Sequence, residues 1–218
     1  MPQAPFEVTK ELTGWSLFWA GLKLRSPDSW SSEQLREMVV QVSRDARDSY
    51  RIAALAQVPT VAALRKLFRE AGCDPTRYRP SSEALLRRIL KGGDIPQIHP
   101  LVDLNNCLSA RLAVPCCVMT VGTFQAPFVF RQGRAGEHYE SLRGPFNLEK
   151  KPLLVDTLGP LDAPITGSER VKVTEETLEA WLVAYLPAAE VSGEEAQDLL
   201  SGYLGQAPVA ELSFALTT

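Results

Sequence analysis

Four polar side chains, His99, Asp103, Asn105 and Asn106, stand close together at the start of an apolar stretch. Their side chains can exchange protons, form hydrogen bonds or bind a metal. They belong to the first polar run, QIHPLVDLNNCLSARLAVPCCVMTV at 97–121, which we expect to pass from a helix into a strand. Polar groups beside a buried run are costly unless they are hydrogen-bonded. The first polar run is therefore either a structural network or the floor of a site.

His99 and Asp103 are four residues apart and would lie one above the other on a helix face. Together with His138 they suggest a metal site or a catalytic triad. However, the chain has only two histidines, its cysteines lack ligand spacing, and no G-x-S-x-G motif is present. We therefore expect no metal and no cofactor. His99 is expected at the helix start, with Asp103 capping neighbouring backbone.

The four cysteines show neither C-x-x-C spacing nor the pattern of a disulfide framework: Cys73, Cys107, Cys116 and Cys117. Reduced thiols are typical of a cytoplasmic protein, which is the location we expect. Cys116 and Cys117 should point to opposite faces of an apolar strand. A nucleophilic cysteine needs a nearby base or cation to form its thiolate, so core packing is the favoured role for both.

Asn105 and Asn106 would face about 100° apart on a helix, so at most one of them points inward. An inward asparagine suits an amino group or a ribose hydroxyl as ligand, and a helix-to-loop hydrogen bond is an equal alternative. In the second polar run, SERVKVTEET at 168–177, Thr174 is expected to begin a helix, because the following Glu175 and Glu176 would be stabilised by the dipole at a helix N-terminus. Ser168 and Glu169 lie too far upstream to cap that helix, which leaves them free to contribute to a site.

Charge is unevenly distributed along the chain, although the net charge is only -3. Residues 60–91 hold eight basic and three acidic side chains, whereas residues 173–218 hold eight acidic side chains and no Lys or Arg. Such segregation can steer a polyanion onto one face of a protein. The alternative is a pair of solvated helix faces.

The elements that must position these residues follow from the apolar patterns. Strands are expected at 14–24, 116–121, 127–131, 152–156, 169–173 and 209–216, and helices at 31–50, 60–71, 81–92, 100–112, 174–186 and from 192 onward. The sequence thus predicts one α+β domain over 1–218, with a mixed or antiparallel sheet flanked by helices. With 45% hydrophobic and 22% charged residues, no run of ~18 apolar residues and no signal peptide, it is typical of a soluble globular protein.

Three segments resemble a known family. IHPLVDLNNCLSARLAVP at 98–115 resembles the I-N-x-L-V-D-V-T-N-Y-V-x-x-x-x-G-x-P stretch in the editing module of the phenylalanyl-tRNA synthetase beta subunit, the tRNA-synthetase B3/B4 domain. GRAGEHYESLRG at 133–144 is similar to that module's G-E-x-x-x-T-L-D-G run. The second polar run and DPTRYRPSSEALLRRILKGG at 74–93 are similar to free-standing members. The chain therefore resembles a stand-alone B3/B4 domain protein, with a core over roughly 55–186 and the terminal elements packed on it.

The resemblance implies an α+β fold whose cleft holds an amino acid, esterified to a tRNA end. In the synthetase this cleft hydrolyses tyrosine wrongly attached to the phenylalanine tRNA. The implied ligand contacts here are Asn106, Cys117, Glu137, Ser168 and Glu169, with Cys117 where the synthetase has a histidine. The implied RNA contacts are Arg77, Arg79, Arg87, Arg88 and Lys91.

Three hypotheses remain open at this point. The first is a deacylase that hydrolyses the ester of mischarged tRNA in trans, with tRNA or aminoacyl-tRNA as partner. The second is a non-catalytic protein that binds an amino acid or a small metabolite in the same cleft. The third is a scaffold in which the polar runs are purely structural.

Overall fold

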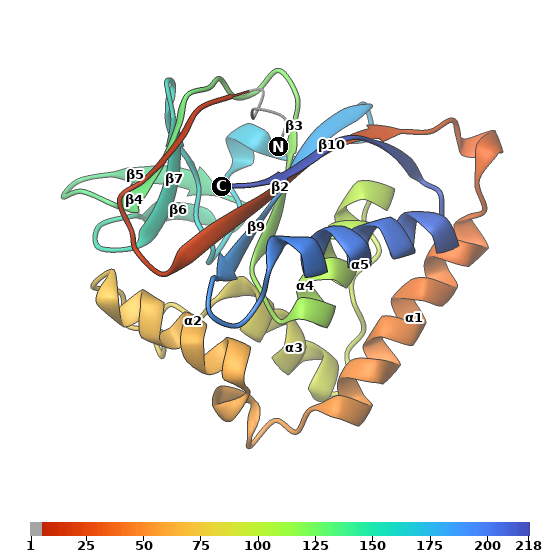
Figure 1. Ribbon diagram of the computed structural model, residues 1–218, viewed down its shortest axis with the longest axis horizontal. Coiled ribbons are helices and arrows are strands. Elements are labelled where there is room, and N and C mark those ends of the chain that lie inside the picture. Colours follow the sequence, from red (N-terminus) through yellow and green to blue (C-terminus); the bar gives the residue numbers. More distant parts are fainter. Residues whose placement is uncertain (1–5) are drawn as a thin grey trace.

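The computed structural model describes residues 6–218, and its α+β architecture confirms the predicted fold class. Two four-stranded sheets and a two-stranded hairpin take the place of the one sheet that the sequence suggested (Figure 1). The central sheet has the order β10-β2-β9-β3 and is antiparallel, with strands Ala210–Thr217, Trp15–Leu24, Glu179–Pro187 and Cys116–Thr120. The outer sheet has the order β1-β4-β7-β8, with strands Val8–Lys10, Phe128–Gln132, Pro152–Asp156 and Gly159–Asp162. Because β1 and β4 run parallel while the other pairs are antiparallel, the outer sheet is mixed.

The helices other than α2 lie along one side of the central sheet, whereas Leu64, Leu67 and Phe68 of α2 pack with residues of both sheets (Figure 1). They are α1 (Ser32–Ser49), α2 (Pro59–Glu70), α3 (Ser81–Leu90), α4 (Pro100–Leu112) and α5 (Gly193–Gln206). Serine side chains cap α1 and α5: Ser31 accepts a hydrogen bond from the Glu33 amide, and Ser192 accepts one from the Glu195 amide. The hairpin is formed by β5 (His138–Ser141) and β6 (Gly144–Asn147). No helix within residues 6–218 combines the length and the apolar character that crossing a bilayer requires.

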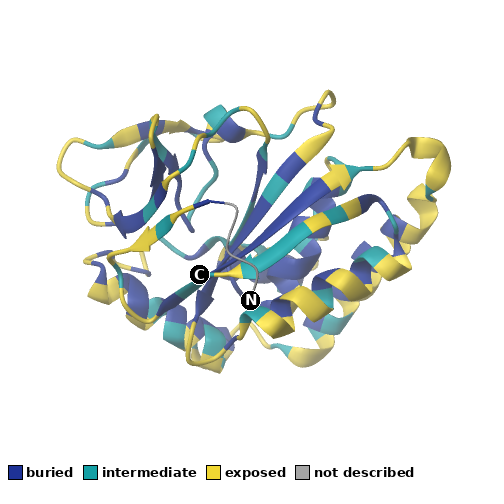
Figure 2. Cartoon of the chain, turned by 45° about the horizontal axis from the view of Figure 1, so that its top comes forward, coloured by how far each residue is buried: buried dark blue, intermediate teal, exposed yellow. Residues whose placement is uncertain are grey.

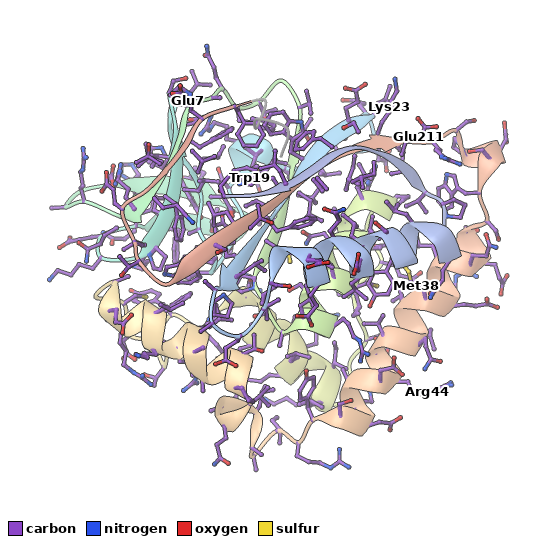
Figure 3. The ribbon with its side chains drawn as sticks, viewed as in Figure 1. Glu7, Trp19, Lys23, Met38, Arg44 and Glu211 are labelled. Carbon is purple, nitrogen blue, oxygen red and sulfur yellow. The ribbon has the colours of Figure 1, made fainter. Side chains whose placement is uncertain are left out.

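The central sheet is buried on both faces. Alternate residues of β2, such as Phe18 and Leu22, enter the core that the helices cover, whereas Leu17 and Trp19 enter a second core between the two sheets. Figure 2 shows the central strands mostly dark blue, while the helices carry exposed outer faces, and Figure 3 places Trp19 near the middle of the molecule. The molecule is therefore layered as helices, central sheet and outer sheet.

The predicted helix at 174–186 is wrong, because these residues contain β9 instead. Leu182 and Ala184 pack under the helices while Trp181 and Val183 pack between the sheets, so after the exposed Glu179 every position of the strand has an apolar or aromatic side chain. A strand buried on both faces loses the two-residue alternation that distinguishes it from a buried helix. The expected helix start at Thr174 is a turn, in which the Thr174 amide donates to Thr177 Oγ1 at 2.9 Å.

The predicted strand at 169–173 is also wrong. Residues Glu169–Val171 form a short 3-10 helix, which the Ser168 hydroxyl caps by accepting from the Arg170 amide at 3.1 Å. Arg170 reaches across to the outer sheet and pairs with both carboxylate oxygens of Asp156 at 3.0 Å. This buried pair fixes the segment as a turn against β7. The remaining predicted helices and strands are confirmed, with boundaries that differ by a few residues at most.

Candidate functional site

The start of α4 explains the first two polar residues of the first polar run. His99 precedes Pro100 at the N-cap, and its Nδ1 accepts from the Leu101 amide at 3.2 Å. Asp103 Oδ1 accepts from the Ile98 amide at 2.8 Å. Burial lowers the pKa of His99 and raises the pKa of Asp103. The predicted capping roles are confirmed, and no three His, Cys, Asp or Glu side chains between residues 6 and 218 are grouped so as to hold a metal.

The end of α4 sets the position of the following strand. Ala113 adopts a left-handed conformation with φ of 56° and ends the helix, and Pro115 prevents its continuation. The Ser109 hydroxyl donates to the Val114 carbonyl at 2.8 Å, and the Ser82 hydroxyl of α3 donates to the Ala113 carbonyl at 3.0 Å. These buried bonds hold β3 against α4 and α3. The asparagines of α4 and the cysteines of β3 consequently line one cavity.

This inner cavity has a volume of about 250 Å³ and lies between α4, β3 and the segment 162–173. Most of its wall is apolar, and two apolar side chains at its rim, Ile98 and Leu142, are 69% and 51% exposed. The polar groups that face it are few: Ser81, Asn105, Asn106, Asp162, Thr166, Ser168, Lys172 and Tyr185. A mostly apolar cavity with a few convergent polar groups is typical of a small-ligand site.

Two buried acceptors of the inner cavity have no partner among residues 6–218: Asn105 Oδ1 and Asp162 Oδ1. The Asn105 amide nitrogen faces Asn106 Oδ1 and the Cys116 carbonyl at 3.4 and 3.5 Å. Because a carbonyl can only accept, this orientation leaves the Asn105 oxygen turned away from protein donors. Asn105 and Asp162 retain only 5% and 1% exposure, so both oxygens are unpartnered and desolvated.

Asp162 lies at the junction of the two sheets. Its Oδ2 accepts a 2.6 Å hydrogen bond from the Tyr185 hydroxyl of β9. Burial raises the pKa of Asp162 to about 7, and the Tyr185 hydroxyl and the Cys117 thiol lower it only in part. Burial likewise raises the pKa of Tyr185 and of Cys117 far above their usual values, and the nearby carboxyl adds to both shifts. Asp162 is therefore the group of this cluster that titrates near neutral pH.

An outer chamber of about 630 Å³ opens next to the inner cavity. The two share four lining residues: Ser81, Asn106, Cys116 and Thr166. The outer chamber carries four arginines and two aromatic rings: Arg77, Arg79, Arg88, Arg143, Tyr78 and Phe146. Guanidinium groups interleaved with aromatic rings suit a ligand that has both phosphates and bases.

The fully buried carboxylate of Glu83 on α3 holds arginines from α2, from α3 and from the loop between them. Glu83 accepts two hydrogen bonds from Arg65, at 2.8 and 3.0 Å, and one from Arg87 at 2.9 Å, while Arg79 Nε lies 3.4 Å away. Burial by itself raises the pKa of Glu83, but the Arg65 and Arg87 guanidiniums hold it below its usual value. One carboxylate is thus surrounded by three cations, and the local charge stays positive.

The structure brings three of the five predicted ligand contacts together at the inner cavity: Asn106, Cys117 and Ser168. Glu137 and Glu169 line neither cavity. The Glu137 carboxylate forms a two-point ion pair with Arg131 at 2.6 and 2.8 Å, and exposed Glu169 pairs with Lys172 at 3.4 Å. Both carboxylates therefore have structural partners away from the cavity.

The five predicted RNA contacts lie on α3, in the loop before it and, for Lys91, at its C-terminal cap. Arg77, Arg79 and Arg88 line the outer chamber. Arg87 and Lys91 line a shallow surface depression together with Arg79 and Arg88. Sequence reasoning missed Asp162 and Tyr185, the most unusual pair of the inner cavity. The only signal for Asp162 was a carboxylate that ends the short run GPLD, and Tyr185 fell in a segment expected to be helical.

The fold is that of an α+β domain with two adjoining cavities. The B3/4 domain family model matches residues 63–199, more than half of the chain, and the chain therefore belongs to this family. The predicted family is thus confirmed, and the match extends beyond the predicted core at its C-terminal side.

A solved structure of an N-terminal fragment of the phenylalanyl-tRNA synthetase beta-subunit from Pyrococcus horikoshii is similar over 100% of this chain and 57% of its own length. The identity is 13% and the TM-score 0.47. The chain thus spans little more than half of that structure. No curated protein matches the chain.

Proposed function

We propose that this protein binds the aminoacylated end of a tRNA and hydrolyses the ester of a mischarged one in trans. The observation that carries the proposal is that the two cavities adjoin each other and share Ser81, Asn106, Cys116 and Thr166. A basic, aromatic-lined chamber of about 630 Å³ lies next to a largely apolar cavity of about 250 Å³. An aminoacylated RNA end has this same sequence of parts: phosphates and bases, a ribose ester, and then a small side chain.

In this arrangement Arg77 and Arg88 contact phosphates, and Tyr78 and Phe146 offer faces for a terminal base. The ester lies at the junction, where Asn106 and Thr166 supply polar groups. Ser168 and Cys117 line the inner cavity around the aminoacyl group. Hydrolysis by a positioned water requires no protein nucleophile, and oxyanion donors at the ester carry most of the stabilisation. Glu137 and Glu169 have no part in the ligand contacts of this proposal.

A second candidate is a non-catalytic protein that binds an amino acid or a related metabolite in the inner cavity. One observation favours it: the inner cavity contains two buried acceptors without a protein partner within residues 6–218, Asn105 Oδ1 and Asp162 Oδ1, which the donors of a free ligand would satisfy. This candidate predicts stabilisation by a free small ligand without turnover of tRNA.

The test is a panel of purified mischarged tRNAs incubated with the protein, with release of the amino acid measured against buffer. We expect faster release for at least one of them, and a slower rate when Asn106→Ala removes the amide at the junction. Asn147→Ala on the exposed hairpin is the matched control. Release at the buffer rate across the whole panel contradicts the deacylase. If free amino acids then raise the melting temperature, the binding protein is the correct reading.

A further inference from the structure

The inner cavity contains a buried carboxylate that has no cation beside it. Asp162 forms no salt bridge, and no Lys or Arg side chain of residues 6–218 is among the groups that shift its pKa. Two other buried carboxylates, Asp156 and Glu83, pair with arginine. Asp103 is buried without a cation as well, but its Oδ1 accepts a hydrogen bond from the Ile98 amide at 2.8 Å, whereas Asp162 Oδ1 has no donor within residues 6–218.

The two unpartnered oxygens belong to residues that line the inner cavity. The Tyr185 hydroxyl donates to Asp162 Oδ2, and the Cys117 thiol and the Ala163 amide also lie close to this carboxylate, but Asp162 Oδ1 and Asn105 Oδ1 have no donor between residues 6 and 218. Two desolvated acceptors, one of them a carboxylate, are complementary to a group with several N–H donors and a positive charge. An ammonium group has three donors and no acceptor, and it supplies the missing counter-charge.

We propose that Asp162 and Asn105 form a recognition site for a primary ammonium group on the ligand that enters the inner cavity. The ligand class is a small aliphatic amine or amino acid, whose carbon atoms pack on the apolar wall formed by Val102, Val118, Val171 and Val173. The inference rests on the proposed function, in which the ligand of the inner cavity is an aminoacyl group. Within that ligand it assigns the ammonium group to Asn105, one of the two asparagines that the sequence offered for an amino group, and to Asp162, which the sequence did not indicate.

A neutral hydroxyl is a weaker match to the same site. A hydroxyl could donate to only one of the two oxygens, and it would leave the carboxylate without a counter-charge. The groups that face Asp162 from neighbouring elements are Tyr185 of β9, Cys117 of β3 and Tyr139 of β5. Burial raises the pKa of all three, so none of them supplies or removes charge between pH 6 and 8.5. Lys172 also lines the inner cavity, but its ammonium group pairs with Glu169 at 3.4 Å and is not among the groups that shift the pKa of Asp162.

The experiment titrates the full chain, without RNA, with n-butylammonium chloride, n-butanol and sodium butyrate at pH 8.5. Binding is followed by isothermal calorimetry and by chemical shifts of ¹⁵N-labelled protein. We expect the amine to bind more tightly than the alcohol and the carboxylate. Asp162→Asn, which keeps the shape but removes the charge, should weaken amine binding by about ten- to a hundredfold. The matched control is Asp103→Asn, which changes a buried carboxylate of α4 that lines neither cavity.

Equal binding of butanol and butylamine overturns the proposal, as does an Asp162→Asn protein that binds the amine with unchanged affinity. If Asp162→Asn does not fold, the pH dependence of amine binding to the wild-type protein tests the proposal instead. Because the pKa of Asp162 is about 7, amine affinity at pH 6 should be about a tenth of its value at pH 8.5. Affinity that does not change with pH contradicts the site.

The outcome is separate from that of the deacylase test. Amine binding without release of amino acids from tRNA supports the ammonium site and contradicts the catalytic proposal. Release of amino acids from tRNA without amine binding supports the catalytic proposal and contradicts the ammonium site.

Discussion

The Tyr185 hydroxyl donates a 2.6 Å hydrogen bond to Asp162 Oδ2, and this bond joins β9 of the central sheet to β8 at the edge of the outer sheet. Tyr185 is fully buried and Asp162 is 1% exposed. The two sheets thus meet through a polar contact at the wall of the inner cavity, inside an otherwise aromatic and aliphatic core. The contact couples the stability of the sheet junction to the protonation of Asp162.

The first prediction is a fall in stability as the pH rises from 5 to 8. The pKa of Asp162 is about 7 in the folded chain, against an ordinary value of 3.8, so the folded state binds more protons than the unfolded state in this range. The stabilisation is complete below pH 3.8, falls steadily as the pH rises between the two pKa values, and is lost above pH 7. The loss should be about 2–3 kcal/mol relative to Asp162→Asn, measured by urea unfolding at both pH values. Parallel stability profiles of the two proteins would contradict the raised pKa.

The second prediction concerns the other partner of this bond. Tyr185→Phe removes the hydroxyl and leaves Asp162 with two unpartnered oxygens, so we expect a loss of about 1–3 kcal/mol in the free energy of unfolding. Tyr50→Phe, at a half-buried ring whose hydroxyl forms no hydrogen bond within residues 6–218, is the control and should change stability little. Denaturant unfolding at pH 7 measures both. Equal effects of the two substitutions would show that the Tyr185 bond adds nothing.

The Asp162–Tyr185 pair also shows where sequence reasoning succeeds and where it fails. The capping roles of His99 and Asp103 were predictable because they depend on neighbours within five residues. Asp162 and Tyr185 are 23 residues apart, and they meet only because β9 is a strand. The sequence of β9 lacks the alternation of polar and apolar residues that identifies a strand, because the two faces of β9 enter two different cores. A helix over 174–186, as the sequence predicts, does not place Tyr185 beside Asp162, and the wall of the inner cavity is therefore not predictable from it.

Glu137 and Glu169 illustrate a related limit. Family resemblance marks the segments that approach a site, but the direction of each side chain depends on local partners. Arg131 on β4 holds Glu137, and Lys172 pairs with Glu169, so both carboxylates lie outside the cavities. By contrast, the basic segment 60–91 was predictable as a surface because its charges are local to α2, α3 and their connection.

The third prediction tests the buried carboxylate of α3. Glu83→Gln leaves Arg65 and Arg87 without their counter-charge, and breaking a buried pair in this way costs about 3–5 kcal/mol. Glu70→Gln is the control, because the exposed Glu70 pairs with Lys66 at 3.8 Å and surface pairs contribute little. Thermal and urea unfolding at pH 7 report the difference. If Glu83→Gln is as stable as Glu70→Gln, the arginines do not depend on this carboxylate.

The fourth prediction concerns the thiols. Burial raises the pKa of all four cysteines, to about 11 for Cys73 and about 12 for Cys107, and higher still for Cys116 and Cys117. The reactive thiolate is therefore scarce at pH 8. We expect Ellman's reagent to label the native protein slowly and the urea-unfolded protein rapidly and completely. Fast labelling of Cys117 in the native protein would show that its thiolate is accessible, and Cys117 would then be a candidate nucleophile.

The last prediction tests the basic wall of the outer chamber. Arg77→Glu and Arg88→Glu each place a carboxylate where a phosphate is proposed to lie, so both should weaken tRNA binding. The loss should be greatest at low salt, and each substitution should reduce the slope of log K against log salt by about 1. Arg44→Glu is the matched control, because Figure 3 places Arg44 on the outer side of α1, where it lines a different depression. Affinity is measured by filter binding at several salt concentrations. If all three proteins bind tRNA equally, the basic surface of α3 is a solvated helix face and the outer chamber is no RNA site.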